Sequence, residues 1–199
     1  MNEKIKTLLT ILFVCIVSSL LSGCGSVEET ICKETEGQER NGLVYLPNQQ
    51  EPFTGNNLCK YENGQIESEG KLKDGKEDGK WTEWYENGQI KSERTYKDGK
   101  LVGKLTWWHL DGQKWSEVNY KDGKEDGKWT AWDENGQKRG EGYYKDDKKD
   151  GKWTRWYENG QIESEANWKD DKREGKWTRW YENGQIREEK NYKDGRQVD

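Results

Sequence analysis

A 24-residue unit recurs at constant spacing through most of this chain, and this periodicity constrains the fold more than any other feature. Six successive copies begin at the residues of one column: Tyr61, Tyr85, His109, Asp133, Tyr157 and Tyr181. The fullest copies contain Tyr-Glu-Asn-Gly-Gln-Ile, then Lys-Asp-Gly-Lys, then Gly-Lys-Trp-Thr-x-Trp. A fixed period of about 20–50 residues is typical of repeat architectures, in which each unit contacts mainly its neighbours. Such proteins usually offer an extended surface rather than an enclosed catalytic pocket.

Each unit contains two β-prone segments separated by turn residues. Residues 80–85 and 89–97 form one such pair, and Asn87-Gly88 between them favours a hairpin with a two-residue type I′ turn. Asp98-Gly99 marks the next turn. Because no segment has helical periodicity, the sequence predicts an all-β fold. We expect an elongated single-layer antiparallel meander of 24-residue β-hairpin repeats.

The loop length decides which side chains share a face. A two-residue loop at Asn87-Gly88 would place Trp84 opposite Lys91, and Trp108 opposite Trp115 in the third copy. Alternation would then put these residues on one face: Trp81, Tyr85, Ile90 and Tyr96. The other face would hold Thr82, Trp84, Lys91 and Glu93. A bulged three-residue loop would shift this register, so both arrangements stay open.

The first residues resemble an export signal. Lys4 and Lys6 precede an apolar run over residues 7–21, which is shorter than the ~18 or more apolar residues of a membrane span. Leu21-Ser22-Gly23-Cys24 resembles the bacterial lipobox, whose cysteine carries lipid and begins the mature chain. We therefore expect a lipoprotein signal peptide over residues 1–23 and export to the cell envelope, at the outer membrane if there are two. A plain signal peptide or N-terminal anchor is the alternative.

The remaining chain divides into two parts by composition. Residues 24–41 lack the repeat pattern and predict a lipidated polar tether. Residues 42–199 form the repeat domain, with a divergent first unit over 42–60 and six copies from residue 61. Cys32 and Cys59 can oxidise in an exported chain, and a disulfide between them would stabilise the fold by about 3.5 kcal/mol.

Composition excludes several classes of protein. Removal of the first 23 residues leaves 176 residues with a net charge of −6 and no basic stripe, so we expect no nucleic-acid partner. Charged residues make up 37% of the chain and hydrophobic ones 29%, which alone would favour disorder. However, the 12 Trp and 10 Tyr lie in register with the repeat, whereas disordered chains have few aromatics.

Catalytic and metal chemistry have little support in the sequence. His109 is the one histidine, in a column of tyrosines, and no nucleophile or orienting partner is identifiable beside it. Zinc would need more His or Cys ligands, and the Asp74-Gly75 turn departs from the calcium-loop pattern at Lys76. We expect a non-enzymatic protein without a cofactor or metal. An acidic column either pairs with lysines or faces a ligand: Glu69, Glu93, Glu117, Glu141, Glu165 and Glu189.

The best binding candidates lie where one copy departs from the others. The third copy and its approach hold Trp107, Trp108, His109 and Trp115. Trp107 occupies a column that is otherwise Glu, Ala or Arg, and Trp115 occupies a column that is otherwise charged. Exposed aromatics of this kind are typical of interface hot spots. The alternative is a purely structural pair of Trp108 with Trp115.

The repeat resembles the bacterial MORN-variant repeat, whose proteins are often labelled YwqK-family antitoxins. Residues 85–100 and 151–162 carry the match most cleanly, and 42–199 carry it as a whole. The resemblance implies a single elongated sheet of hairpins and interaction with a partner protein, and it supplies no catalytic residues. An antitoxin would meet its toxin in the cytoplasm, whereas Cys24 directs this chain to the envelope.

The expected function is therefore a lipid-anchored protein-protein interaction module, antitoxin-like by resemblance, held to the membrane through Cys24. The alternative is an envelope glycan-binding module that stacks sugars on exposed Trp and Tyr.

Overall fold

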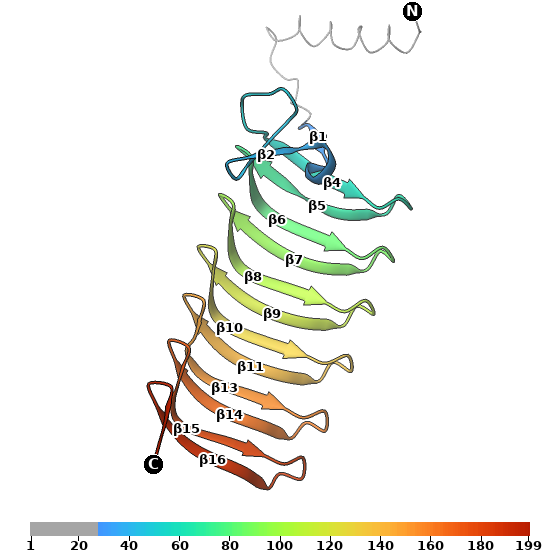
Figure 1. Ribbon diagram of the computed structural model, residues 1–199. Coiled ribbons are helices and arrows are strands. Elements are labelled where there is room, and N and C mark those ends of the chain that lie inside the picture. Colours follow the sequence, from blue (N-terminus) through green and yellow to red (C-terminus); the bar gives the residue numbers. More distant parts are fainter. Residues whose placement is uncertain (1–27) are drawn as a thin grey trace, which may run out of the picture.

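The structure is a computed structural model that describes residues 28–199 as one long sheet with a small cap at its N-terminal end (Figure 1). The expected signal peptide and the lipidation site Cys24 lie outside the described residues. Over residues 28–199, helices are too short and polar to cross a membrane.

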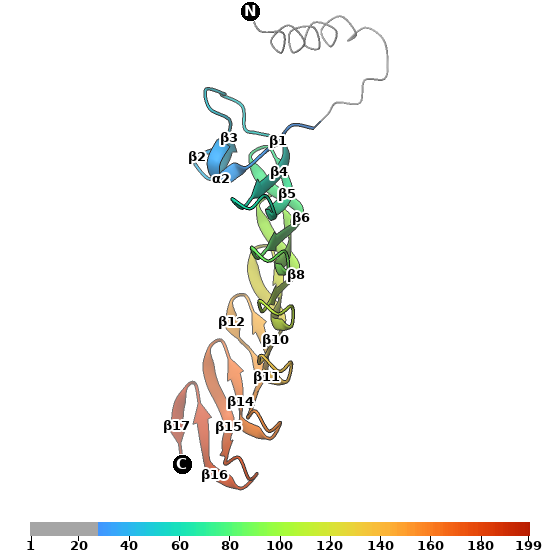
Figure 2. The same cartoon turned by 90° about the vertical axis from the view of Figure 1, so that its right-hand side faces the viewer.

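Six consecutive hairpins make up most of the sheet over residues 28–199, and this confirms the predicted all-β meander. The hairpins are β4 (Gly55–Lys60) with β5 (Ile66–Lys73), β6 (Lys76–Trp84) with β7 (Ile90–Lys97), β8 (Lys100–Trp108) with β9 (Lys114–Lys121), β10 (Lys124–Trp132) with β11 (Lys138–Lys145), β13 (Gly151–Trp156) with β14 (Ile162–Lys169), and β15 (Lys172–Trp180) with β16 (Ile186–Lys193). Short strands complete the sheet: β1 (Thr30–Ile31) parallel to β4, β12 (Lys148–Lys149) beside β11, and β17 (Arg196–Val198) beside β16. Figure 2 shows that the sheet twists along its length, as right-handed strand twist requires.

The N-terminal segment forms a folded cap instead of the expected polar tether. From residue 28 onward it contributes β1, the short helix α2 (Lys33–Glu36) and β2 (Gln38–Arg40), which pairs with β3 (Leu43–Tyr45) in a separate two-stranded sheet. The divergent first unit thus supplies only β4 to the long sheet. Figure 2 shows α2, β2 and β3 on one side of the first hairpins. The cap helps to bury the core of the molecule, formed by Ile31, Phe53, Leu72 and Trp81, with Val44, Leu46 and Tyr96 packed against them.

The two kinds of turn lie at opposite ends of the strands (Figure 1), and only the Asn-Gly turn departs from the geometry that the sequence predicts. At the Asn-Gly turn, Gly88 N donates to Tyr85 O (2.8 Å), and only Gly88 of the Asn-Gly pair has a positive φ, of 83°. This is a three-residue loop with a left-handed glycine, so the predicted two-residue type I′ turn is wrong here. Asp98 and Gly99 instead have φ of 51° and 78°, which is the type I′ combination.

The longer loop shifts the register next to it. Trp84 lies opposite Ile90, with a bulge at Lys91, whereas Thr82 still lies opposite Glu93. Ile90 therefore shares a hollow with Trp84 and Thr82, and Lys91 Nζ lies 3.9 Å from a carboxylate oxygen of Glu83. The predicted face assignment is thus wrong for Ile90 and Lys91, which exchange sides.

The two faces can be named by their most regular columns. The Trp face carries Trp81, Leu105, Trp129, Trp153 and Trp177. The Thr face carries Thr82, Thr106, Thr130, Thr154 and Thr178, all buried. Rings stack between repeats on the Trp face, where the centroids of Trp129 and Trp153 are 5.0 Å apart.

Charged side chains on the Thr face form ion pairs with one another. In each of the five hairpins from β6–β7 onward a lysine and a glutamate meet across the hairpin: Lys80–Glu93, Lys104–Glu117, Lys128–Glu141, Lys152–Glu165 and Lys176–Glu189, at 2.5–3.2 Å. Burial opposes ionisation of Glu117, but hydrogen bonds from Lys114 and Lys104 hold its pKa below the usual value. The acidic column therefore serves the packing of the repeat.

Tyrosines of the opening column link consecutive repeats. The hydroxyls of Tyr61 and Tyr85 donate to the backbone oxygens of Trp84 and Trp108, each at 2.7 Å, one repeat further on. His109 stands where the next tyrosine would be, and its Nε2 is buried without a hydrogen-bond partner among the described residues. The column therefore has a weak link in the middle of the ribbon.

Restoring the tyrosine should strengthen that link. His109→Tyr is expected to raise the free energy of unfolding by about 0.5–1.5 kcal/mol, because its hydroxyl can reach the backbone oxygen of Trp132 as Tyr85 reaches Trp108. The melting temperature would rise by about 1–5 °C. His109→Phe is the control, since it keeps the ring without the hydroxyl. An equal rise for both variants would show that ring packing, not the hydrogen bond, is responsible.

Candidate functional site

Some columns of the repeat keep their residue type, whereas others change from copy to copy. On the Thr face the threonine, lysine and glutamate columns keep their residue types in each of these repeats. On the Trp face two neighbouring columns change in chemical type between copies. One holds Glu83, Trp107, Ala131, Arg155 and Arg179, and the other holds Lys91, Trp115, Arg139, Glu163 and Arg187. The Thr face also varies, for example in the column of Tyr143, but only the Trp face gains two tryptophans in one hairpin, Trp107 and Trp115. The Trp face is therefore the candidate interaction surface.

Three of the predicted residues meet on this face in the third hairpin. Trp107 of β8 and Trp115 of β9 lie edge to face, with ring centroids 6.3 Å apart. His109, at the start of the connecting turn, lies 6.2 Å from Trp115. Trp115 is 51% exposed. We call Trp107, His109 and Trp115 the aromatic patch.

Trp108 does not belong to this patch. The bulge places it opposite Lys114, in the Thr-face column with Trp84 and Trp132, so the alternative pairing of Trp108 with Trp115 is wrong. Its backbone oxygen accepts the hydroxyl of Tyr85. Trp108 therefore serves the contact between repeats.

In the hairpin next to the cap, the same two columns hold charged side chains that are paired. In the second hairpin Glu83 forms an ion pair with Arg94 on the same face and lies near Lys91. These charged groups pair with one another, whereas the aromatic patch presents a Trp115 ring that is 51% exposed. Rigid aromatic side chains are the residues that interfaces use as anchors.

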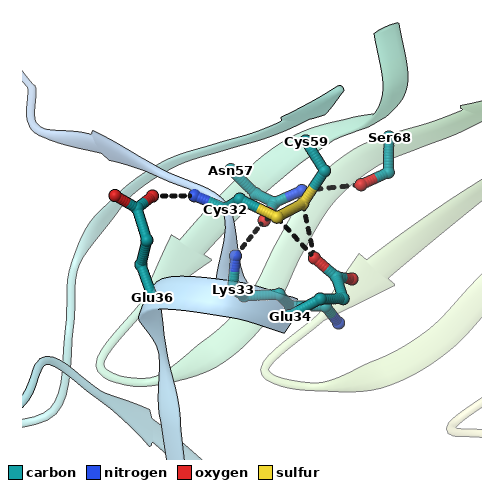
Figure 3. The surroundings of a disulfide bond; sticks show 7 residues. All are labelled: Cys32, Lys33, Glu34, Glu36, Asn57, Cys59 and Ser68. Carbon is teal, nitrogen blue, oxygen red and sulfur yellow. Dashed lines mark hydrogen bonds between the residues drawn. A yellow bond between two sulfur atoms is a disulfide. The ribbon is translucent and has the colours of Figure 1, made fainter. Parts of the chain in front are cut away.

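A disulfide holds the cap to the sheet (Figure 3). Cys32 precedes α2 and Cys59 lies in β4, and their sulfur atoms are 2.07 Å apart. Beside it, Asn57 Oδ1 accepts the backbone N–H of Lys33 (2.9 Å), and Asn57 Nδ2 donates to Ser68 (3.0 Å).

The same group of residues could suggest a metal site. Potential ligand atoms of Cys32, Glu34 and Cys59 lie within 4.8 Å of one another. Because the two sulfur atoms are bonded to each other, they are not available as thiolates, which are the form that binds zinc. The disulfide accounts for the grouping.

Stacked hairpins in one long sheet define a β-repeat protein with two extended faces. Five stretches match the MORN repeat variant family: residues 77–98, 101–122, 125–146, 149–170 and 173–194. Together they cover more than half of the chain, which therefore belongs to this family. Four stretches begin in the first strand of a hairpin and the stretch 149–170 begins in β12, and each ends in the next Asp-Gly or Asp-Asp turn. A search of curated proteins finds no significant match.

A second group of residues on the Trp face departs from the repeat pattern and was not predicted from the sequence. Lys149, Arg155, Arg173 and Arg179 make this face cationic near the C-terminal end. Comparison of the columns would have found them, since Glu77 and Glu83 hold the columns of Lys149 and Arg155 in the second copy.

Proposed function

We propose that the chain is an exported, lipid-anchored repeat protein that binds another protein through the aromatic patch and has no enzymatic activity. The observation that carries this proposal is the cluster of Trp107, His109 and Trp115 on the Trp face, in which the Trp115 ring is 51% exposed. The Leu-Ser-Gly-Cys sequence ending at Cys24 supports the lipid anchor. An antitoxin-like role, holding a partner protein inactive at the envelope, fits within this proposal.

The chemistry of the patch favours binding over catalysis. His109 is the one histidine of the chain, and the ring in contact with it belongs to Trp115 rather than to an acid or a nucleophile. Two tryptophans held edge to face supply a large apolar surface at little entropic cost on binding. A partner protein that presents an apolar side chain would bury this surface.

A glycan is the second candidate, because the exposed ring of Trp115 is able to stack on a sugar. Trp107 and His109 flank that ring, which leaves less of it free than a sugar platform normally offers.

Cross-linking in the cells of origin tests the proposal. The full-length chain with a C-terminal tag is cross-linked in place, purified and analysed for attached proteins and polysaccharides. Trp107→Glu with Trp115→Lys is expected to lose the partner at least tenfold, the scale of a hot-spot loss of about 2 kcal/mol. It should fold normally, because Glu83 and Lys91 occupy these positions in the second copy.

Tyr143→Asn is the matched control. Tyr143 is 46% exposed on the Thr face, and Asn119 and Asn167 hold its column in other copies. This variant should keep the partner. A partner retained by the double tryptophan variant would rule out the patch, and recovery of polysaccharide alone would favour the glycan function.

The same cells test the anchor. Cys24→Ala is expected to move the chain from the membrane fraction to the soluble fraction and to abolish labelling by a fatty acid. Unchanged fractionation and labelling would exclude Cys24 as the lipid site.

A further inference from the structure

A groove lies on the Trp face near the C-terminal end, over β12 to β15, with a volume of about 340 Å³. Four cationic residues line it, Lys149, Arg155, Arg173 and Arg179, and Glu163 is its one acidic residue. Arg179 pairs with Glu163 at 3.0 Å. Within residues 28–199, the other three cations form no ion pair. The groove therefore holds a surplus of positive charge.

Aromatic rings hold these cations in place. Lys149 Nζ lies 4.4 Å from the ring centroid of Trp153 and 4.9 Å from that of Trp168. The Arg173 guanidinium carbon lies 5.1–5.5 Å from three ring centroids, those of Trp168, Trp177 and Tyr192. These contacts orient the charges without neutralising them. They also cover the ring faces that a neutral sugar would need for stacking.

The charges in the groove are partly desolvated. Burial lowers the pKa of Lys149, and the neighbouring Arg155 lowers it further. Arg173 Nε is buried without a hydrogen-bond partner among the described residues. An anion that enters the groove would stabilise the charged form of Lys149 and could accept a hydrogen bond from Arg173 Nε. Both interactions are strong where water is scarce.

We propose that this groove binds an acidic peptide segment of a partner protein, and that Lys149, Arg155 and Arg173 hold its carboxylates. This inference deepens the proposed protein-binding function and rests on it. Lys149 and Arg173 occupy the same column in neighbouring repeats, which are about 9.6 Å apart. A polyproline II segment has three residues per turn and rises about 3.1 Å per residue, so carboxylates three residues apart lie on the same side and about 9.3 Å apart. One such segment along the ribbon axis can therefore reach both.

A membrane surface fits the groove less well. The chain has a net charge of −5, which opposes approach to anionic lipid. Lys149 and Arg173 are half-buried between rings rather than projecting from the face. A flat bilayer would not reach them, whereas a narrow peptide would.

Fluorescence anisotropy on the full chain tests the proposal with a labelled (Glu-Gly-Gly)4 peptide as the probe and (Gln-Gly-Gly)4 as its neutral counterpart. Wild-type protein should bind the acidic probe and not the neutral one. Lys149→Glu with Arg155→Glu should weaken binding by about tenfold or more, because the new acids would pair with Arg173 and Arg179. Glu77 and Glu83 in these columns show that the strands accept acids. If this variant has a lowered melting temperature, Lys149→Gln with Arg155→Gln removes the two positive charges without adding negative ones.

The control carries the same change of net charge outside the groove. Lys172 and Lys193 are exposed on β15 and β16 of the same region, and Lys172→Glu with Lys193→Glu should bind the probe like wild type. Equal loss of probe binding in both double variants would show that overall charge is responsible and would overturn the proposal. Preferential binding of phosphatidylglycerol vesicles over the peptide would also overturn it.

The aromatic-patch variant separates this proposal from the one it rests on. Trp107→Glu with Trp115→Lys leaves the groove intact and should bind the acidic probe unchanged. If that variant loses the cellular partner but wild-type protein does not bind the acidic probe, the groove proposal is wrong and the aromatic-patch proposal stands.

Discussion

Trp81→Ala is expected to lower the free energy of unfolding by about 3–5 kcal/mol, the cost of removing a large aromatic side chain from a core. Trp81 is 1% exposed and lies where the cap meets the sheet. Its Nε1 donates to the backbone oxygen of Lys71 (3.1 Å), and its ring meets Tyr96 edge to face at 6.3 Å. The variant therefore loses apolar burial, a hydrogen bond and an aromatic contact together.

The packing beneath Trp81 leaves little room for the site to collapse. Its indole lies directly on Gly70, where a Cβ would come within 2.2 Å of the ring. Alanine at position 81 would leave a cavity bounded by the glycine and by the cap residues Ile31 and Phe53. Cavities that cannot close cost more than the transfer free energy of the lost atoms.

Trp177→Ala is the matched control in the same column. Trp177 is only half-buried, near Arg173 and Lys190 and without a cap above it, so its loss should cost about 1–2 kcal/mol. Denaturant unfolding of both variants, followed by circular dichroism, makes the comparison. Equal costs at the two positions would contradict the view that the cap provides the core of this molecule.

The repeat fold was predictable because period, turn residues and alternation all agree. Hairpins with strands near residues 80–84 and 90–97 follow from sequence alone. The error lay in the turns, because Asn-Gly and Asp-Gly both favour type I′ geometry. In this chain the Asp-Gly turn adopts it, and the hydrogen bond from Gln89 N to Asn87 Oδ1 (3.0 Å) supports the longer loop. One extra loop residue moved Trp107, not Trp108, next to Trp115.

The cap and the groove could not be predicted in the same way. Residues 28–41 have no repeat and few apolar side chains, and their order depends on contacts distant in sequence, such as Ile31 with Trp81 and Cys32 with Cys59. The groove combines residues from two repeats, so no single motif marks it. Both features become visible only when the register between strands is known.

Loss of the disulfide should release the cap and leave the rest of the ribbon folded. The bridge joins residues 27 apart in sequence, and its removal by Cys32→Ser with Cys59→Ser is expected to cost about 2–4 kcal/mol. Cys59 is 1% exposed, so the substitution also places a hydroxyl in the core, to which Asn57 lies close. The oxidised wild-type chain should be lighter than the reduced chain by the mass of two hydrogen atoms.

The expected damage is local because each repeat contacts mainly its neighbours. Hydrogen exchange should quicken in residues 28–60 and in β5 and β6, where Leu72 and Trp81 lose their cover, and should stay unchanged from β10 onward. Faster exchange along the whole ribbon would show instead that the protein unfolds as one cooperative unit. The aromatic patch lies in the next hairpin, on β8, β9 and their connecting turn, and its residues are not among the core residues Ile31, Phe53, Leu72 and Trp81. Partner binding through the patch is therefore expected to survive reduction of the disulfide, whereas Trp107→Glu with Trp115→Lys should abolish it with the bridge intact.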